Sequence, residues 1–76
     1  MNQTEFKVAQ IRAKLTVEEI AKKLGVNATT VYRKISGESD FTLSELKTLK
    51  RILCLSNDDV DRIFFNGELT ESQVAN

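Results

Sequence analysis

The residues best placed to do chemistry form one short segment near the middle of the chain, ATTVYRKIS at positions 28–36. If this segment is a helix with Val31 and Ile35 on its inner side, its outer side is small, hydroxyl-bearing and basic. The outward residues are then Ala28, Thr29, Tyr32 and Arg33, with Ser36 at the end. An arginine fork can donate two hydrogen bonds to guanine, and methyl groups can touch thymine. The segment is typical of a helix that reads base edges in the major groove.

Ordinary explanations exist for some of these residues. On an isolated helix, Arg33 is more often a solvated charge or the salt-bridge partner of a glutamate. Tyr32 fits a base edge, a phosphate, or a cover over the domain's own apolar surface with its hydroxyl in water. Cys54 follows Leu53 in an apolar stretch, so we expect a small buried side chain without reactivity.

Catalysis and metal binding have little support in the composition. The chain has no histidine and a single cysteine, which excludes an internal disulfide and an ordinary zinc site. Its carboxylates, lysines and thiol show no recognisable catalytic spacing. We therefore expect no enzyme activity, no metal, no cofactor and no small-molecule substrate.

The length and composition are those of one small globular domain. Of 76 residues, 41% are hydrophobic and 29% are charged. Apolar runs such as Ile52–Leu55 are far shorter than the roughly 18 residues of a membrane span, and the polar start is no signal peptide. We expect a cytoplasmic protein without membrane contact, with a domain at residues 1–67 and a polar, flexible tail at 68–76.

The charges cancel overall but are unevenly distributed. Residues 1–51 contain ten basic and six acidic residues, a net charge of +4. Residues 52–76 contain one basic and five acidic residues, a net charge of −4. This polarity suits one nucleic-acid face and an acidic back, although an unevenly charged solvated surface is the alternative.

Start and stop signals divide the chain into five helices and predict an all-α fold. Thr16 and Thr42 are each followed by a glutamate three residues on, as in a capping box. Asn27 and Ser56 are further N-cap residues, and the three glycines, at positions 25, 37 and 67, fall where helices should end. The predicted helices lie at residues 4–14, 17–24, 28–36, 43–54 and 57–65.

Apolar spacing predicts the buried side of most of these helices. Val17, Ile20, Ala21 and Leu24 follow helical spacing in the second, and Leu46, Leu49 and Leu53 in the fourth. The first helix has two stripes, one through Phe6, Ala9 and Ala13 and one through Val8, Ile11 and Leu15, so its buried side stays open. At the chain's aromatic pair, one ring of Phe64 and Phe65 should complete the core and the other remain exposed, which would suit a dimer interface.

The stretch Thr16–Gly37 joins two short helices through only Gly25, Val26 and Asn27. Such a joint forces a steep crossing, and a small Ala21 suits the closest approach, so the set indicates a helix-turn-helix. The stretch resembles the Cro/repressor-type (Xre-like) helix-turn-helix family, particularly its small phage-encoded members. The likeness covers about residues 5–65 and extends to FTLSE at 41–45 and the Phe64–Phe65 pair.

The resemblance implies a compact five-helix, lambda-repressor-like domain that acts as a repressor or Cro-like regulator on double-stranded operator DNA. It further implies a homodimer, at least on DNA, with recognition helices about 34 Å apart. Backbone phosphates would be held by residues around the reading helix and by the free N–H groups that begin the second helix. These phosphate-contact residues are Thr16, Val17, Asn27, Lys34, Ser36 and Ser39.

Two departures from the family pattern concern these contacts. Val17 stands where many relatives have glutamine, so one side-chain contact is missing. Lys34 stands where the wider family places a core aliphatic residue, and Ile35 takes over that role, as in the phage-encoded members. A protein-interaction module on the same scaffold is the alternative function, suggested by the neutral net charge, Val17 and an exposed Phe65.

Overall fold

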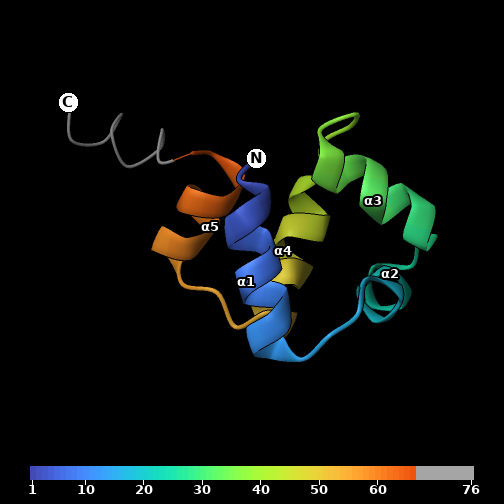
Figure 1. The fold of residues 1–76 in the computed structure, drawn as a ribbon, viewed down its shortest axis with the longest axis horizontal. Coiled ribbons are helices and arrows are strands. Elements are labelled where there is room, and N and C mark those ends of the chain that lie inside the picture. The colour runs from blue at the N-terminus through green and yellow to red at the C-terminus, as the bar shows by residue number, and fades with distance from the viewer. Residues whose placement is uncertain (67–76) are drawn as a thin grey trace.

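A computed structural model describes residues 1–66, and every regular element within them is an α-helix (Figure 1). The helices are α1 (Gln3–Ala13), α2 (Val17–Leu24), α3 (Ala28–Ser36), α4 (Leu43–Ile52) and α5 (Asn57–Phe64). The predicted all-α class with five helices is confirmed for this part of the chain, and α2 and α3 have the predicted bounds. The predicted stop at Gly67 and tail at 68–76 lie outside the described residues.

Local signals in the sequence define most helix ends. Three helices, α2, α4 and α5, begin with reciprocal capping boxes. The pairs are Thr16 with Glu19, Thr42 with Glu45, and Ser56 with Asp59. Gly25 and Gly37 close α2 and α3 with φ of 76° and 93°, in the left-handed region that glycine adopts without a steric penalty.

The core takes one fully buried side chain from each helix. These residues are Phe6, Ile20, Val31, Leu49 and Ile63. On α1, the stripe through Phe6 and Ala9 faces inward, whereas Val8 and Ile11 are exposed. The open choice between the two stripes of the first helix is therefore settled by the packing of Phe6.

Three aromatic rings join α1 and α5 to the loop before α4. Phe6 stacks against Phe41 with ring centroids 6.2 Å apart, and Phe64 meets both rings edge-on. Phe64 thus packs against the core as predicted for one ring of the pair. Phe65 is half-buried, not fully exposed as predicted for the other ring.

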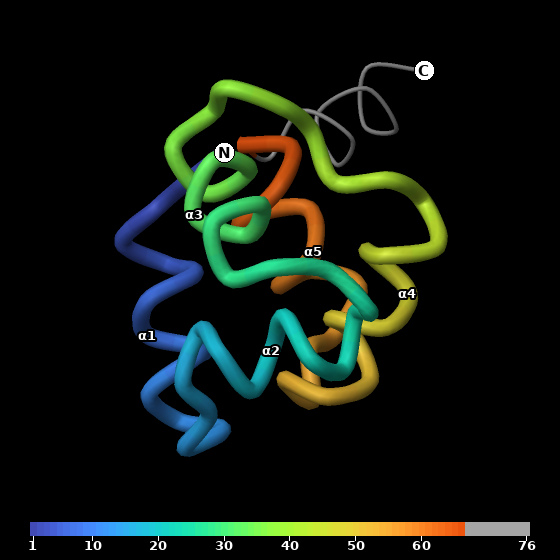
Figure 2. The backbone as a smooth tube through the Cα atoms, turned by 90° about the vertical axis from the view of Figure 1, so that its right-hand side faces the viewer, coloured from blue at the N-terminus to red at the C-terminus, as the bar shows by residue number. Residues whose placement is uncertain are grey.

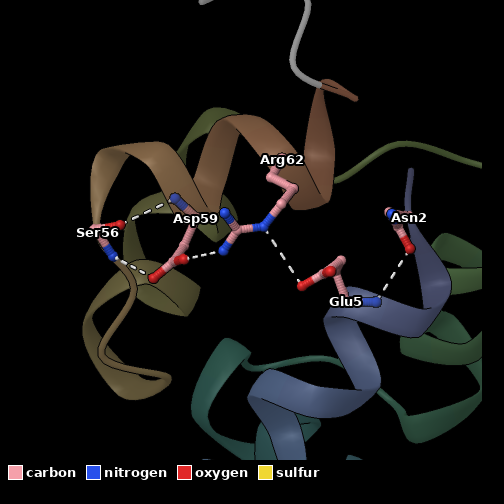
Figure 3. A network of polar contacts seen from close by, with 5 residues as sticks. All are labelled: Asn2, Glu5, Ser56, Asp59 and Arg62. Carbon is pink, nitrogen blue, oxygen red and sulfur yellow. Dashed lines mark hydrogen bonds and ion pairs between the residues drawn. The ribbon is translucent and has the colours of Figure 1, made fainter.

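Polar contacts fasten α1 to α5 (Figure 3). The backbone N–H of Asn2 donates to the carbonyl of Ile63 at 2.7 Å. Arg62 on α5 forms ion pairs with Asp59 of its own helix and with Glu5 of α1, the latter with Nε and Oε2 3.5 Å apart. Because the three charged side chains are between 29% and 53% exposed, water screens these ion pairs and each contributes little to stability.

Cys54 contradicts the prediction of a buried thiol, because its side chain is exposed. The fourth helix ends at Ile52, two residues earlier than predicted, and Cys54 lies in the following turn with φ of 54°. Leu53 and Leu55 on either side of it are buried, so the turn directs its flanking residues inward. In residues 1–66, no helix is both long and apolar enough to cross a membrane.

Candidate nucleic-acid interface

A short connection of three residues holds α3 steeply across α2. Figure 1 views α2 end-on with α3 lying across the picture, and Figure 2 views α3 end-on with α2 across it. The N–H of Val26 donates to the carbonyl of Ala21 at 3.0 Å, which closes the turn, and Ala21 itself is buried. Small size at Ala21 and a left-handed Gly25 therefore allow the close crossing that the sequence predicted.

The first turn of α3 differs from the starts of the other helices. Asn27 occupies the N-cap position, but its side chain makes no capping hydrogen bond, and it is exposed. All four other helices have a side-chain cap. The first N–H groups of α3 are left without a side-chain acceptor, so this helix end can accept an anionic or polar group from another molecule.

Three predicted base-contact residues, Thr29, Tyr32 and Arg33, are exposed on one side of α3. Val31 between them is fully buried, and Ile35 is half-buried against the core. The predicted inward and outward sides of the helix are therefore correct for these five residues. Along one helix face, Thr29 thus presents a hydroxyl and a methyl group, Tyr32 a phenol and Arg33 a guanidinium.

Arg33 has one weak partner. Its Nε lies 3.7 Å from Oε2 of Glu38, and the two side chains are 65% and 68% exposed. An ion pair so exposed contributes little, because water screens the charges and both side chains lose rotamer freedom. The guanidinium thus remains available to an incoming hydrogen-bond acceptor.

Ala28 is the exception among the predicted base-contact residues. It is half-buried and packs against the hydrophobic core, so the prediction of an outward side chain is wrong in part. The reason is its place in the first turn of α3, directly after the tight connection, where the helix lies closest to α2. Only part of its methyl surface is open to a neighbouring molecule.

Lys34, a predicted phosphate contact, is engaged within the protein. Its Nζ donates to Oε1 of Glu45 at 2.5 Å and lies 5.8 Å from the centroid of the Phe41 ring. Both charged side chains are only 12% exposed. Lys34 therefore ties α3 to the start of α4, with its ammonium beside the Phe41 ring.

The pKa of Glu45 reflects this environment. Burial by itself raises the pKa, but the hydrogen bond from Lys34 and the capping hydrogen bond from the Thr42 backbone outweigh burial and lower it below 4.5. The carboxylate is consequently charged at neutral pH. It neutralises Lys34 and completes the capping box of α4 at the same time.

Val17 is another of the predicted phosphate contacts. Its side chain is 7% exposed and belongs to the core, so only its backbone N–H remains for an anion. Thr16, just before it, is exposed but engaged in the capping box with Glu19. The Thr16 hydroxyl accepts from the Glu19 N–H and keeps its own O–H, so the start of α2 can offer this hydroxyl as well as free main-chain N–H groups.

The remaining predicted phosphate contacts are all exposed. Ser36 donates its hydroxyl to the carbonyl of Arg33 at 2.9 Å, while Ser39 lies in the loop that follows α3. Asn27 lies at the opposite end of the helix. Ser36 and Ser39 thus lie near one end of α3 and Asn27 at the other, whereas Thr16 and Val17 lie at the start of α2.

The sequence analysis allowed a salt bridge between Arg33 and a glutamate, but it named neither Glu38 nor the pairing of Lys34 with Glu45. The capping pattern accounted for Glu45, but it carried no signal for an ion pair eleven residues back along the chain. Glu38 follows Gly37, and only the helix end at that glycine brings it beside Arg33. The first pairing depends on a tertiary contact and the second on the geometry of a turn. Neither produces a periodic pattern in the sequence from which it could be predicted.

Among the described residues, no cluster of three or more acidic, cysteine or histidine side chains could hold a metal ion. No protein-family model, curated protein or solved structure matches the chain.

Proposed function

We propose that this chain is a sequence-specific DNA-binding transcriptional regulator. In this proposal α2 and α3 form a helix-turn-helix, and α3 enters the major groove of operator DNA. The domain is then lambda-repressor-like, and its role is that of a repressor or Cro-like protein. It needs no cofactor and has no enzymatic activity.

The observation that carries the proposal is the exposed side of α3. Thr29, Tyr32 and Arg33 share it above a fully buried Val31, and the helix is held by a core that all five helices build. A groove about 12 Å wide accepts one helix, whose side chains then reach the base edges. Arg33 is the guanine-reading residue, because its fork can donate to O6 and N7 together.

The experiment that tests the proposal is selection of bound duplexes from a random pool, with wild type and Arg33→Ala compared. We expect wild type to enrich a motif and the variant to lose or relax preference at a guanine, a loss of about 1–3 kcal/mol of discrimination. Arg51→Ala on α4 is the matched control, since it removes another exposed arginine outside α3. If wild type enriches no motif and does not bind bulk DNA at low salt, the proposal fails.

The same selection tests the proposed homodimer. Paired recognition helices read two half-sites about 34 Å apart, so the enriched motif should be an inverted repeat with centres one helical turn apart. A single half-site with a monomeric mass in light scattering, with and without DNA, would argue for a monomeric reader.

A protein-interaction module is the second candidate function. It is favoured by the pairing of both basic residues of α3 with glutamates, which lowers the positive charge that a DNA-binding helix presents. Bulk DNA distinguishes the two functions. Phosphate neutralisation releases counterions, so DNA binding must weaken steeply as salt rises, whereas an interaction module shows no such binding.

A further inference from the structure

A groove of about 360 Å³ lies beside the proposed reading helix, between α1, α3 and the start of α2. Its floor is apolar and includes Phe6, Leu15 and Ile35. Polar groups from three elements line its walls. They are Lys7 and Gln10 of α1, Thr16 and Glu18 at the start of α2, and Tyr32 of α3.

We propose that this groove binds the sugar-phosphate backbone of DNA, with Lys7 as its principal phosphate ligand. The inference rests on the proposed function, because the strand in the groove belongs to the duplex that α3 reads. The phosphate would meet the ammonium of Lys7, and the sugar would lie over the apolar floor. No signal in the sequence had placed α1 at the interface.

Lys7 is the strongest reason for this assignment. It is exposed and, within residues 1–66, forms no ion pair or side-chain hydrogen bond, in contrast to Lys34 and Arg33 of α3. A strongly hydrated ammonium with no protein partner is suited to a phosphate, which it binds as a point charge. Lys7 therefore brings an unpaired positive charge to the interface, whereas the charge of Lys34 is neutralised by Glu45.

The start of α2 contributes to the same groove from its other wall. Val17 and Glu18 are the first two residues of this eight-residue helix, so their N–H groups have no intrahelical acceptor. The positive end of the helix dipole lies there as well. Lys7 and the first residues of α2 line the same groove, so an ammonium and free amides can both attract one anion there.

Tyr32 separates this groove from the base-reading side of α3. It lines the groove and is 53% exposed, whereas Arg33, the next residue, does not line it. We therefore assign the Tyr32 hydroxyl to the backbone and the Arg33 guanidinium to the bases. This choice resolves the three explanations that the sequence left for Tyr32.

Glu18 opposes an anion in the groove, and this opposition makes the inference testable with two changes of opposite sign. Lys7→Gln removes an attraction to phosphate, and Glu18→Gln removes a repulsion. Arg12→Gln is the matched control, because Arg12 is an exposed cation of the same helix that lines a different hollow, between α1 and α5. Thermal unfolding of each variant verifies that the fold is retained.

Affinity for a duplex of random sequence is measured by fluorescence anisotropy over a series of salt concentrations. Loss of one phosphate contact reduces the slope of log K against log salt by about 0.9, which corresponds to about eightfold weaker binding at about 0.1 M if affinities converge near 1 M. We expect this loss for Lys7→Gln and about twofold tighter binding for Glu18→Gln. Arg12→Gln should leave the slope near that of wild type.

The outcomes separate this inference from the function on which it rests. If wild type binds DNA but Lys7→Gln and Arg12→Gln have equal slopes, the groove does not hold a phosphate and the inference is overturned, while the proposed function stands. An unchanged or weaker affinity for Glu18→Gln argues against the inference in the same way. If wild type does not bind DNA at all, both fail.

Discussion

Arg33 and Lys34 are neighbours on one helix, yet they belong to two different regions of the molecule. Arg33 lies on the outer side of α3, in an ion pair with Glu38 whose side chains are about two-thirds exposed. Lys34 lies on the side toward α4, in an ion pair with Glu45 whose side chains are 12% exposed. Adjacent side chains on a helix point about 100° apart, so one can face solvent while the next faces the edge of the core.

Two adjacent cations of similar size can therefore have different roles, one in binding a ligand and the other in packing α3 against α4. An exposed guanidinium keeps its hydrogen-bond donors for a ligand. A largely buried ammonium needs its carboxylate, because an unpaired charge at that depth is costly. Lys34 therefore fixes where α3 lies relative to α4, and Arg33 acts from that position.

The largest expected effect is a difference in the free energy of unfolding that is lost when each ion pair is broken. Lys34→Met keeps the stem beside Phe41 but leaves Glu45 without its counter-charge. We expect a loss of about 2 kcal/mol, between the roughly 0–1 kcal/mol of surface pairs and the roughly 3–5 kcal/mol of broken buried pairs. Arg33→Met should cost less than about 0.5 kcal/mol, as surface substitutions usually do. Urea unfolding measures both.

Double-mutant cycles provide the control for this difference. Lys34→Met with Glu45→Gln should show a coupling above about 1 kcal/mol, and glutamine retains an acceptor for the α4 cap. Arg33→Met with Glu38→Gln should show almost none. Equal couplings would mean that the depth of the pair is irrelevant to its strength.

A second, smaller effect is the pH dependence of the stability that the pair of Lys34 and Glu45 contributes. The pKa of Glu45 is lowered in the folded state, so its contribution to stability is present above its ordinary value of 4.5 and is lost as pH falls through the folded pKa. The pKa values of Glu19 and Asp59 are lowered as well, mainly by their capping hydrogen bonds with the Thr16 and Ser56 backbones, but these boxes persist in Lys34→Met. The stability difference between wild type and Lys34→Met should therefore shrink as pH falls below 4.5 and through the lowered pKa of Glu45. Urea unfolding at a series of pH values measures it, and a constant difference would contradict the assigned cause.

Most of the fold was predictable because its signals are local. Thr16, Thr42 and Ser56 cap helices through bonds to residues three positions on, and Gly25 and Gly37 end helices through their own φ. Apolar spacing identified the buried side of α2 for the same reason. The end of α4 was less predictable, because the apolar run through Leu55 continues past the point where the chain turns at Cys54.

The candidate site was predictable only where helix periodicity decides exposure. Periodicity placed Thr29, Tyr32 and Arg33 outside and Val31 inside, as found. It could not foresee that Glu45 would meet Lys34 or that Lys7 would line a groove with Tyr32, since these depend on the packing of separate helices. Nearness between distant residues is a tertiary property that one sequence without relatives does not display.

The smallest expected effect concerns Glu38, the weak partner of Arg33. Glu38→Gln removes an exposed pair with 3.7 Å between its charged atoms, so stability should change by less than about 0.5 kcal/mol. DNA affinity should rise by about twofold, because a negative charge near the groove disappears and the Arg33 fork no longer has a charged competing acceptor. Anisotropy with the selected operator measures the gain, and Asp58→Asn, an exposed acid in the first turn of α5, is the matched control. Equal gains in both variants would show that net charge alone governs binding, and the distinction between the two sides of α3 would then apply to stability but not to recognition.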